Sequence, residues 1–502
     1  MQPGNLLIIL SDQHHPRMMG CAGHSIVRTP NMDRLAARGT RFSSAYTNCP
    51  ICVPARASLA TGRYVHEHRC WDNAIAYDGS VPSWGHRLIA QGHEVVAIGK
   101  LHYVKSDPQR NGFTEEIVPM HLADGDGDVV GLIRDELIVR KGAAKLGPEA
   151  GPGESHYTAY DRKISDLACD WLERAARKQP GKPWVLYVGF VCPHPPLIAP
   201  PEYFNMYADC DIPMPKLYAQ NERPRHPYIE YMRRSRPEDE GFAGPEMVKR
   251  AVAAYMGSVS FLDHNVGKVL DALERAGLSA STRVIYGSDH GESLGARGLW
   301  TKRLLYEESV GIPLIVAGPD VPAGRTVSDP VSLVDVFPTV LDCAGVAPSA
   351  ADANLPGSSL LRAAASGATP PRTVLSEYHA AASPSASYMI RKERFKYIHY
   401  VGYAPMLFDL INDPEELRDL AGDPVFKEEL ASCEAKLREI VDPEAVDRRA
   451  KADQAVMIER LGGKDAVLRR GAVRISPPPG VPTTRIAAER VRDEDATPSG
   501  SR

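Results

Sequence analysis

A cysteine, a proline and an arginine at alternate positions form the segment of this chain best suited to chemistry. They are Cys52, Pro54 and Arg56, a C-x-P-x-R pentapeptide, and Thr-Gly-Arg follows at residues 61–63. Pro54 suits the first turn of a helix, where its missing N–H costs nothing, and Gly62 can end that helix. Cys52 would then stand just before a helix N-terminus, where unpaired N–H groups and the helix dipole favour an anion.

Less reactive interpretations of Cys52 remain open at this point. Buried cysteines commonly pack as small hydrophobic side chains. Cys49 and Cys52 form a C-x-x-C pair that could be redox-active at a helix start, although the surrounding sequence does not resemble the βαβ unit of a thioredoxin-like protein. A zinc site would need a second pair of ligands, and the chain has no second C-x-x-C.

Polar residues follow four predicted strands. Residues 6–10, 94–98, 184–191 and 282–287 are apolar runs, typical of strands buried on both faces of a parallel sheet. The polar residues just beyond them are Asp12 and Gln13, Lys100 and His102, His194, and Asp289 and His290. Taken singly, such residues are usually turns, caps or surface groups. Ligand sites in open α/β sheets lie at the carboxyl ends of strands, so we expect these side chains to meet there.

The elements that must position these residues predict an α/β fold. Strands alternating with helices through about residue 360 predict a doubly wound, mostly parallel sheet flanked by helices. Short strands within 374–409 and a helix at 426–440 predict a smaller C-terminal α+β domain. We expect one domain over residues 1–365, a second over 366–445 and a charged, proline-containing tail over 446–502.

Several segments carry more specific expectations. The helix at 245–277 could be interrupted near Gly257, and residues 362–372 have the composition of a linker. Residues 103–157 and 200–245 are predicted to be irregular. From Pro477 onward we expect an extended or disordered chain.

Composition excludes several classes of protein. The chain has 502 residues, a formal net charge of −4 and nine scattered cysteines. Balanced charge argues against a nucleic-acid partner, and the cysteines do not form a disulfide framework. No apolar run reaches the ~18 residues of a membrane span, and the N-terminus does not resemble a signal peptide. We expect a cytoplasmic homo-oligomer without a membrane or nucleic-acid partner.

The pentapeptide with residues 61–63 resembles the signature of the type I sulfatases of the alkaline phosphatase superfamily. The resemblance extends over residues 72–74, the Lys100-x-His102 pair, residues 288–302 and residues 408–417, and it spans roughly residues 5–440. In that family the motif cysteine is oxidised to Cα-formylglycine by a formylglycine-generating enzyme, and the hydrate of the aldehyde is the nucleophile. The resemblance therefore implies a sulfuric ester hydrolase that acts on a small-molecule sulfate ester.

The resemblance also implies a divalent cation. Its ligands would be Asp12, Gln13, the formylglycine made from Cys52, Asp289 and His290. Oxygen-rich ligation favours Ca²⁺ or Mg²⁺, whereas a histidine ligand shifts the preference toward Mn²⁺. We place Ca²⁺ first and keep Mg²⁺ and Mn²⁺ as alternatives.

The catalytic residues implied by the resemblance are Cys52, Arg56, Asn73, Lys100, His102, His194 and Lys302. The cationic groups would offset the charge that develops on the sulfate. Asp289 would help to deprotonate the hydrate, and His102 would remove its second proton as sulfate leaves. Lys302 or His194 would protonate or stabilise the leaving oxygen.

The substrate remains open among choline, aryl and other alkyl sulfates. Residues 72–74, the Lys100-x-His102 pair and residues 294–300 most resemble choline sulfatases, and Trp300, Tyr103 and Tyr306 are candidates for an aromatic cage around choline. Phosphonate monoester or phosphodiester hydrolases are the nearest alternative, but they carry Tyr and Thr in place of the Lys-His pair. Metal-dependent phosphatases with a serine or threonine nucleophile, and a non-catalytic binding protein on the same fold, are more distant alternatives.

Overall fold

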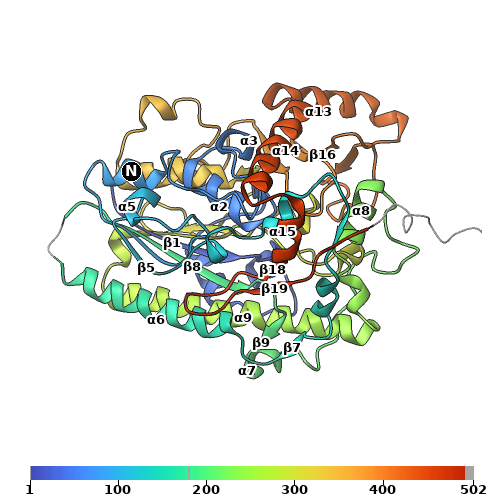
Figure 1. The fold of residues 1–502 in the computed structure, drawn as a ribbon. Coiled ribbons are helices and arrows are strands. Elements are labelled where there is room, and N and C mark those ends of the chain that lie inside the picture. The colour runs from blue at the N-terminus through green and yellow to red at the C-terminus, as the bar shows by residue number, and fades with distance from the viewer. Residues whose placement is uncertain (1, 179–180, 492–502) are drawn as a thin grey trace, which may run out of the picture.

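An eight-stranded sheet forms the centre of the protein in a computed structural model, which describes residues 2–178 and 181–491 (Figure 1). Across the sheet the strands are β12 (Arg325–Val327), β2 (Gly39–Phe42), β11 (Leu314–Ala317), β10 (Thr282–Ser288), β1 (Asn5–Asp12), β8 (Val185–Pro193), β4 (Val95–Lys100) and β5 (Glu115–Met120). Only β11 runs antiparallel to its neighbours among these strands. The prediction of a mostly parallel sheet is therefore confirmed.

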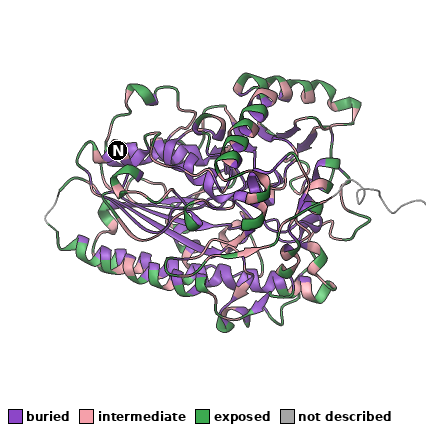
Figure 2. Cartoon of the chain, in the orientation of Figure 1, coloured by how far each residue is buried: buried purple, intermediate pink, exposed green. Residues whose placement is uncertain are grey.

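Helices cover both faces of this sheet, so alternate residues of the central strands enter different cores. Leu7 and Ile9 of β1 pack with α1 (Pro30–Ala37), α6 (His156–Ala176) and α9 (Pro245–Arg275). Leu6 and Ile8 face α2, α4 and α11, which span Cys52–Thr61, Trp84–Ile89 and Val336–Ala344. Figure 2 shows the strands as a buried layer between partly exposed helices.

The helix α9 is continuous, so the expected interruption near Gly257 is wrong. A Cβ atom on Gly257 would lie 2.9 Å from the Cβ of Ala199 and 3.1 Å from the backbone nitrogen of Phe204. The glycine therefore permits a close approach of α7 (Pro201–Phe204) to the helix instead of breaking it.

A second, antiparallel sheet contains β14 (Thr373–Tyr378), β15 (Ser387–Lys392), β16 (Phe395–Tyr400) and β17 (Met406–Asp409). The helix α13 (Lys427–Ile440) packs against it through the buried side chains of Cys433 and Leu437. This confirms the predicted C-terminal α+β unit. The segment expected to be a linker begins inside a helix, α12 (Leu360–Ser366).

The C-terminal segment returns to contact residues 129–139 (Figure 1). It contains α14 (Pro443–Arg460), α15 (Lys464–Arg470), β18 (Ala472–Ile475), β19 (Thr484–Ile486) and β20 (Glu489–Arg490). β18 pairs with β19, and β20 pairs with β6 (Ile138–Val139). The expectation of an extended or disordered chain from Pro477 overlooked β19 and β20, and its last part, residues 492–502, lies outside the described residues.

The remaining short elements lie in segments that we expected to be irregular or that connect the main elements. They are α3 (Val65–His68), α5 (Pro108–Asn111), α8 (Pro227–Ser235), α10 (Glu307–Val310), β3 (Ala45–Tyr46), β7 (Gly151–Pro152), β9 (Ile198–Ala199) and β13 (Val331–Ser332). Within the described ranges, no helix is both long and apolar enough to cross a membrane.

Candidate active site

Neighbouring strands and one helix start bring the polar groups together. The central order β10–β1–β8–β4 places the ends of these four strands along one edge of the sheet. Asp12 is the last residue of β1, Lys100 is the last residue of β4, and Asp289 follows β10 directly. Cys52 is the first residue of α2, one position further into the helix than we expected, and Gly62 ends that helix with φ 68°.

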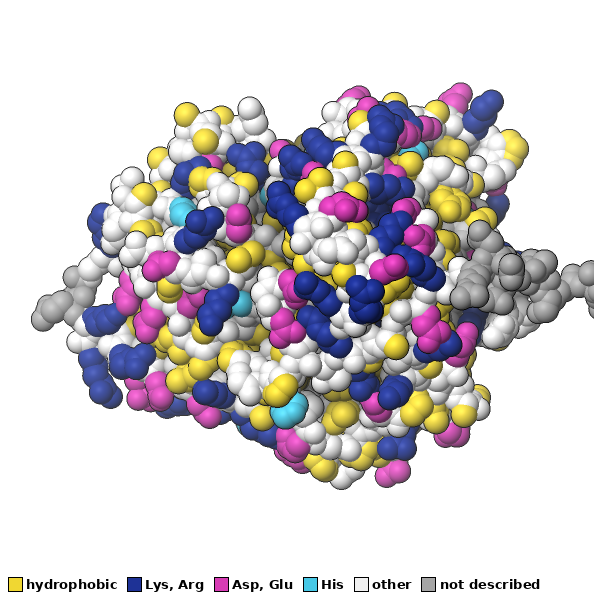
Figure 3. Space-filling model, in the orientation of Figure 1, with side chains coloured by type: hydrophobic (Ala, Val, Ile, Leu, Met, Phe, Trp, Pro, Cys, Tyr) yellow, Lys and Arg dark blue, Asp and Glu magenta, His cyan; other side chains and the backbone are white. Residues whose placement is uncertain are grey.

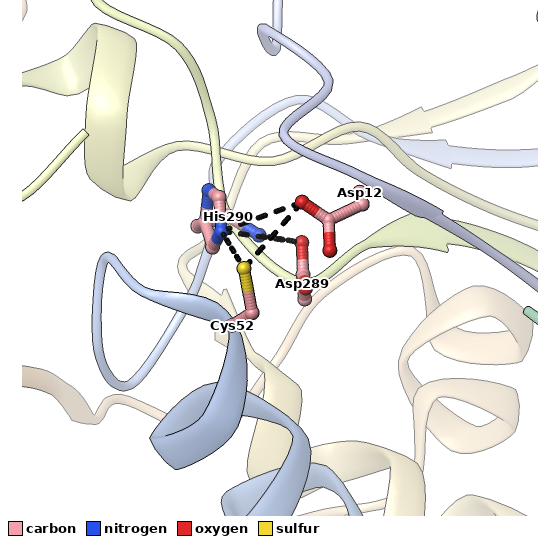
Figure 4. Close-up of side chains that lie close together, drawn as sticks. All are labelled: Asp12, Cys52, Asp289 and His290. Carbon is pink, nitrogen blue, oxygen red and sulfur yellow. Dashed lines mark hydrogen bonds and ion pairs between the residues drawn. The ribbon is translucent and has the colours of Figure 1, made fainter. Parts of the chain in front are cut away.

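Asp12, Cys52, Asp289 and His290 form a buried cluster in which candidate ligand atoms lie within 4.8 Å of one another (Figure 4). The Sγ atom of Cys52 is 3.2 Å from Nε2 of His290 and 3.6 Å from Oδ1 of Asp12. Nε2 of His290 is 3.6 Å from Oδ1 of Asp289. Two carboxylates and an imidazole around one point are donors that a divalent cation can use.

Gln13 is the remaining residue that we expected to hold the cation. Its backbone N–H donates to Oδ1 of Asp289 at 3.2 Å, and its side-chain Nε2 donates to Glu292. Its Oε1 atom is buried and accepts no hydrogen bond from the described residues. Because an unpaired buried carbonyl is costly, this oxygen fits the role of a cation ligand.

Three cationic side chains surround the carboxylates. Arg56 donates from Nε to Oδ2 of Asp289 at 2.8 Å and from Nη2 to Oδ2 of Asp12 at 3.2 Å. Nζ of Lys100 lies 2.6 Å from the same Asp12 oxygen. Lys302 is the third cation, and its Nζ atom is 2.9 Å from Sγ of Cys52.

These charges give the carboxyl groups of Asp12 and Asp289 different pKa values. Burial alone would raise the pKa of Asp12, but Lys100, His194, Lys302 and Arg56 together hold this pKa well below its usual range. Burial and repulsion from Asp12 raise the pKa of Asp289 to about 6, against the opposing effect of Arg56. Asp12 is therefore the more strongly ionised of the two, and Asp289 takes up a proton more readily.

The unmodified cysteine is a poor nucleophile in this place. Burial, followed by repulsion from Asp12, raises the pKa of Cys52 to about 11, although Lys302 and Lys100 oppose the shift. Burial also raises the pKa of Cys49 well above its usual value. Both residues are free thiols, and their raised pKa values argue against a low-pKa redox pair. Contacts of Cys52 with polar groups equally argue against simple apolar packing.

Two histidines reach the site without belonging to the cluster. Both ring nitrogens of His102 are buried without a hydrogen-bond partner in the described chain, and its backbone φ is 61°. Burial and the neighbouring Lys100 keep the pKa of His102 well below 6.5, so its ring is neutral. Nδ1 of His194 lies 2.7 Å from the carbonyl oxygen of Pro195, which leaves Nε2 for a ligand.

Asn73 has a different contact from the other predicted residues. Its Oδ1 atom accepts a hydrogen bond from the backbone N–H of Val53 at 3.2 Å. That N–H lies in the first turn of α2, where helices have unpaired donors. Asn73 therefore fixes the helix start that carries Cys52, and its side chain also lines the cavity above.

A cavity of about 440 Å³ opens over the cluster. Its lining residues near the thiol are Gln13, Cys52, Asn73, His102, His194 and Lys302. Its outer wall is formed by apolar residues from three regions, Leu122, Leu146, Leu197, Ile198, Val473, Ile475 and Ile486. Lys and Arg side chains gather on the surface over the C-terminal helices and hairpin (Figure 3).

Comparison with known proteins decides the family. The family model described as Sulfatase matches residues 4–346. The chain belongs to the sulfatase family. A second model, N-sulphoglucosamine sulphohydrolase, C-terminal, matches residues 295–442. The predicted family and the prediction of a sulfuric ester hydrolase are thus confirmed.

Individual relatives agree with this assignment. The sulfatase chain is 32% identical to a choline-sulfatase of Rhizobium meliloti, with 84% of this chain and 83% of that protein covered. It is 31% identical to arylsulfatase K of Bos taurus, with 87% and 82% covered. A phosphonate monoester hydrolase of Agrobacterium radiobacter superposes with a TM-score of 0.68 at 25% identity over 87% of this chain and 95% of that one. A solved structure described as a putative sulfatase from Bacteroides thetaiotaomicron superposes with a TM-score of 0.71 at 24% identity. It covers 89% of this chain and 94% of that one.

The aromatic residues considered for choline do not line the cavity of this sulfatase. The ring of Trp300 stacks on Phe242 with centroids 4.1 Å apart, Tyr103 packs on Tyr77 at 4.8 Å, and Tyr306 lies under the guanidinium of Arg297. The aromatic rings on the cavity wall, within the described chain, are Tyr157 and Tyr378.

Sequence reasoning missed several residues of the cavity. They are Tyr157, Arg236, Glu238 and Arg303, together with Val473–Ser476 and Ile486. Arg236 and Glu238 lie in a segment expected to be irregular, and the last group lies in the predicted tail. Arg303 had a usable signal, because it follows Lys302 directly.

Proposed function

We propose that this chain hydrolyses a small sulfate monoester over Cys52, after conversion of Cys52 to formylglycine and with a divalent cation bound beside it. The observation that carries the proposal is the position of the thiol. Its Sγ atom lies 2.9 Å from Nζ of Lys302, 3.2 Å from Nε2 of His290 and 3.6 Å from Oδ1 of Asp12. A nucleophile there would meet both the positive charge and the proton-transfer groups that an anionic ester requires.

The residues present fit a divalent cation. Asp12, Asp289, Gln13 through its unpaired Oε1, and His290 would hold it, together with residue 52. The bound ion would supply positive charge to the sulfate oxygens. Oxygen donors predominate, so we keep Ca²⁺ as the first choice and Mg²⁺ or Mn²⁺ as alternatives.

Formylglycine at position 52 would supply a hydrated aldehyde in place of a thiol that is protonated at neutral pH. Lys302, beside this position, would bind the sulfate and stabilise the oxygen of the departing alcohol. His194 offers Nε2 on the cavity side for the same oxygen, because Nδ1 is engaged by Pro195. His102 has a neutral ring with no competing partner in the described chain, which suits it to accept a proton in the second half of the reaction.

Sulfate release from 4-nitrophenyl sulfate tests this function. We expect protein made together with a formylglycine-generating enzyme to release sulfate, and Cys52→Ala to be inactive. The modified protein should be about 18 daltons lighter than the thiol form, which follows from replacing the thiol by an aldehyde. Equal rates for the two proteins would remove the proposal.

A phosphonate monoester hydrolase is the second candidate, because the solved structure of one superposes well on this chain. Such enzymes carry Tyr and Thr at the positions of Lys100 and His102. We therefore favour the sulfate ester. Phenyl phosphonate esters supplied beside aryl sulfates would distinguish the two. A higher kcat/KM for the phosphonate ester would reverse our choice.

We also infer the setting of the enzyme from its thiols. All nine cysteines lie among the described residues and are free, which suits a reducing compartment. A cytoplasmic location, assembly into a homo-oligomer and maturation by a formylglycine-generating enzyme remain our predictions.

A further inference from the structure

We propose that the substrate carries a second anionic group, a carboxylate or a further sulfate, and that Arg236 and Arg303 bind it. This inference rests on the proposed sulfatase function. Both arginines line the cavity that contains Cys52. The backbone of Arg303 is hydrogen-bonded to Pro50, two residues before Cys52, so the group that it binds would lie in the same cavity as the ester sulfate.

The two arginines share a single carboxylate oxygen. Nε of Arg236 donates to Oε1 of Glu238 at 3.1 Å, and Nη2 of Arg303 donates to the same atom at 2.5 Å. Thr301 also donates to this oxygen through Oγ1 at 3.1 Å. No described residue accepts a hydrogen bond from the Nη groups of Arg236 or from Nη1 of Arg303, so these donors remain for a ligand.

The other acidic residues of the cavity wall are engaged elsewhere. Asp128 accepts from Arg140 at 2.7 Å, Glu154 accepts from Arg162 at 2.7 Å, and Glu149 pairs with Arg474. Asp72 accepts hydrogen bonds from the backbone of Ala74 and from the side chain of Gln454. Asp128 also attracts Arg236, as does Glu238, and Arg140 repels it. Glu238 is the one acid, within the described residues, that hydrogen-bonds both arginines. The three guanidinium groups of Arg140, Arg236 and Arg303 therefore face two carboxylates, and the balance of charge there is positive.

The pKa of Arg236 also reflects its positively charged neighbours. Burial and repulsion from Arg303 lower the pKa of Arg236 to about 10, against the attraction of Glu238. The guanidinium remains protonated at neutral pH, and an added anion would relieve this repulsion. Planar guanidinium groups bind carboxylates and sulfates through paired N–H donors, which makes them suited to such a subsite.

The backbone holds Arg303 in an unfavourable conformation. Its φ is 97°, and φ of Thr301 is 63°. The backbone N–H of Arg303 donates to the carbonyl of Pro50 at 3.2 Å, and that of Thr301 donates to Glu292 at 2.5 Å. Residues in the left-handed region persist where surrounding contacts over-determine them, commonly at ligand sites. These contacts tie the position of Arg303 to the segment that precedes Cys52.

The two arginines disfavour choline sulfate as the substrate. A quaternary ammonium group needs aromatic faces, and the three aromatic residues considered for that role lie outside the cavity. Arg236 and Arg303 would instead attract an ester whose alcohol part is acidic.

A matched pair of aryl sulfates, 4-carboxyphenyl sulfate and 4-methylphenyl sulfate, tests the proposal. The 3-substituted isomer of each ester is assayed as well. We expect Arg236→Gln to lower kcat/KM for at least one carboxylated ester about ten- to a hundredfold, as for the loss of a charge-assisted hydrogen bond. The methyl esters should change less than about threefold, and Arg236→Lys should restore part of the loss. Arg234→Gln, an exposed neighbour, is the matched control.

Equal losses on both kinds of ester, or no loss on either, would overturn the second subsite. Calorimetric titration of the carboxylated esters into Cys52→Ala, with and without Arg236→Gln, keeps this test independent of turnover. Weaker binding in the double variant supports the subsite even if no ester is hydrolysed, whereas unchanged binding refutes it. Failure of every ester to react would instead remove the proposed hydrolase function.

Discussion

Among single residues, Glu292 shows how a side chain outside the cluster can set the ligands inside it. Its buried carboxylate accepts hydrogen bonds from Nε2 of Gln13 and from the backbone N–H groups of Leu294 and Thr301. An ionised carboxylate only accepts hydrogen bonds, so it selects the nitrogen end of the Gln13 amide. The oxygen end is thereby left without a hydrogen bond from the described residues and is available to the proposed cation. Glu292 is a positioning residue in this arrangement.

Glu292→Gln should weaken cation binding. A glutamine can present either its nitrogen or its oxygen to Gln13, so the orientation of the Gln13 amide is no longer fixed. We expect the affinity for Ca²⁺ or Mn²⁺ to fall about 10- to 100-fold, the usual effect of losing a partner of a metal ligand. Calorimetric titration of the ion into unmodified protein measures this without activity. The exposed Glu240→Gln serves as control, and equal affinities in both variants would contradict the role of Glu292.

At the scale of elements, strand ends explain why so much of the site could be predicted. Asp12 and Asp289 follow strongly apolar strands, and adjacent parallel strands deliver their ends to one edge. Arg236 could not be found in this way, because it lies beyond the short helix α8 in a segment without strong periodicity. β2 and β12 were also missed, since these short strands contain Thr and Arg and depend on pairing with their neighbours.

The hairpin of β18 and β19 was missed because its contacts are distant in sequence. The side chain of Val467, just before it, is fully buried in a cluster with Val129 and Val130. The backbone carbonyl of Ser476 accepts a hydrogen bond from Tyr157 Oη at 2.7 Å. Proline and charge in the local sequence predicted a tail, whereas tertiary contacts with residues 129–157 make it a wall of the cavity.

Ile475→Ala should therefore change substrate binding more than chemistry. Ile475 lines the outer cavity, and removing its apolar contact would weaken ground state and transition state alike. We expect KM for an aryl sulfate to rise about fivefold, equivalent to about 1 kcal/mol, with kcat nearly unchanged. Steady-state kinetics measure both constants. Val425→Ala is the control, because Val425 is 82% exposed, and this variant should behave as wild type. If Ile475→Ala also had the KM of the wild type, the hairpin would not touch the substrate.

Across the whole molecule, the four-stranded sheet and the segment before Cys52 share a core. Tyr46, Cys49 and Ile51 pack with residues of β14 and β15. Two buried histidines outside this core link folding to pH, because burial lowers the pKa of His14 to about 4 and that of His68 to about 3. Folding therefore keeps these rings neutral at a pH where the unfolded chain would protonate them.

Stability should consequently fall on acidification. Unfolded histidines have a pKa near 6.5, so below that pH the unfolded state binds protons that the folded state excludes. The free energy of unfolding then decreases by up to about 1.4 kcal/mol per pH unit for each such residue, until its folded pKa is reached. His66 acts in the opposite direction, because Glu377 at 2.9 Å outweighs burial and raises its pKa. Its contribution is present below pH 6.5 and is lost as pH rises through the folded pKa.

Urea denaturation at pH 7, 6 and 5 separates these contributions. His68→Gln should flatten the dependence of the unfolding free energy on pH by nearly one proton, since Ser58 keeps a hydrogen-bonding neighbour while the titratable ring is removed. His66→Gln should steepen the same dependence, because the ion pair with Glu377 no longer opposes the loss. The two variants carry the same side-chain replacement in one helix, α3, so a general destabilisation of that helix would move both curves alike. Parallel shifts of this kind, with no change of slope, would show that neither ring couples folding to proton binding.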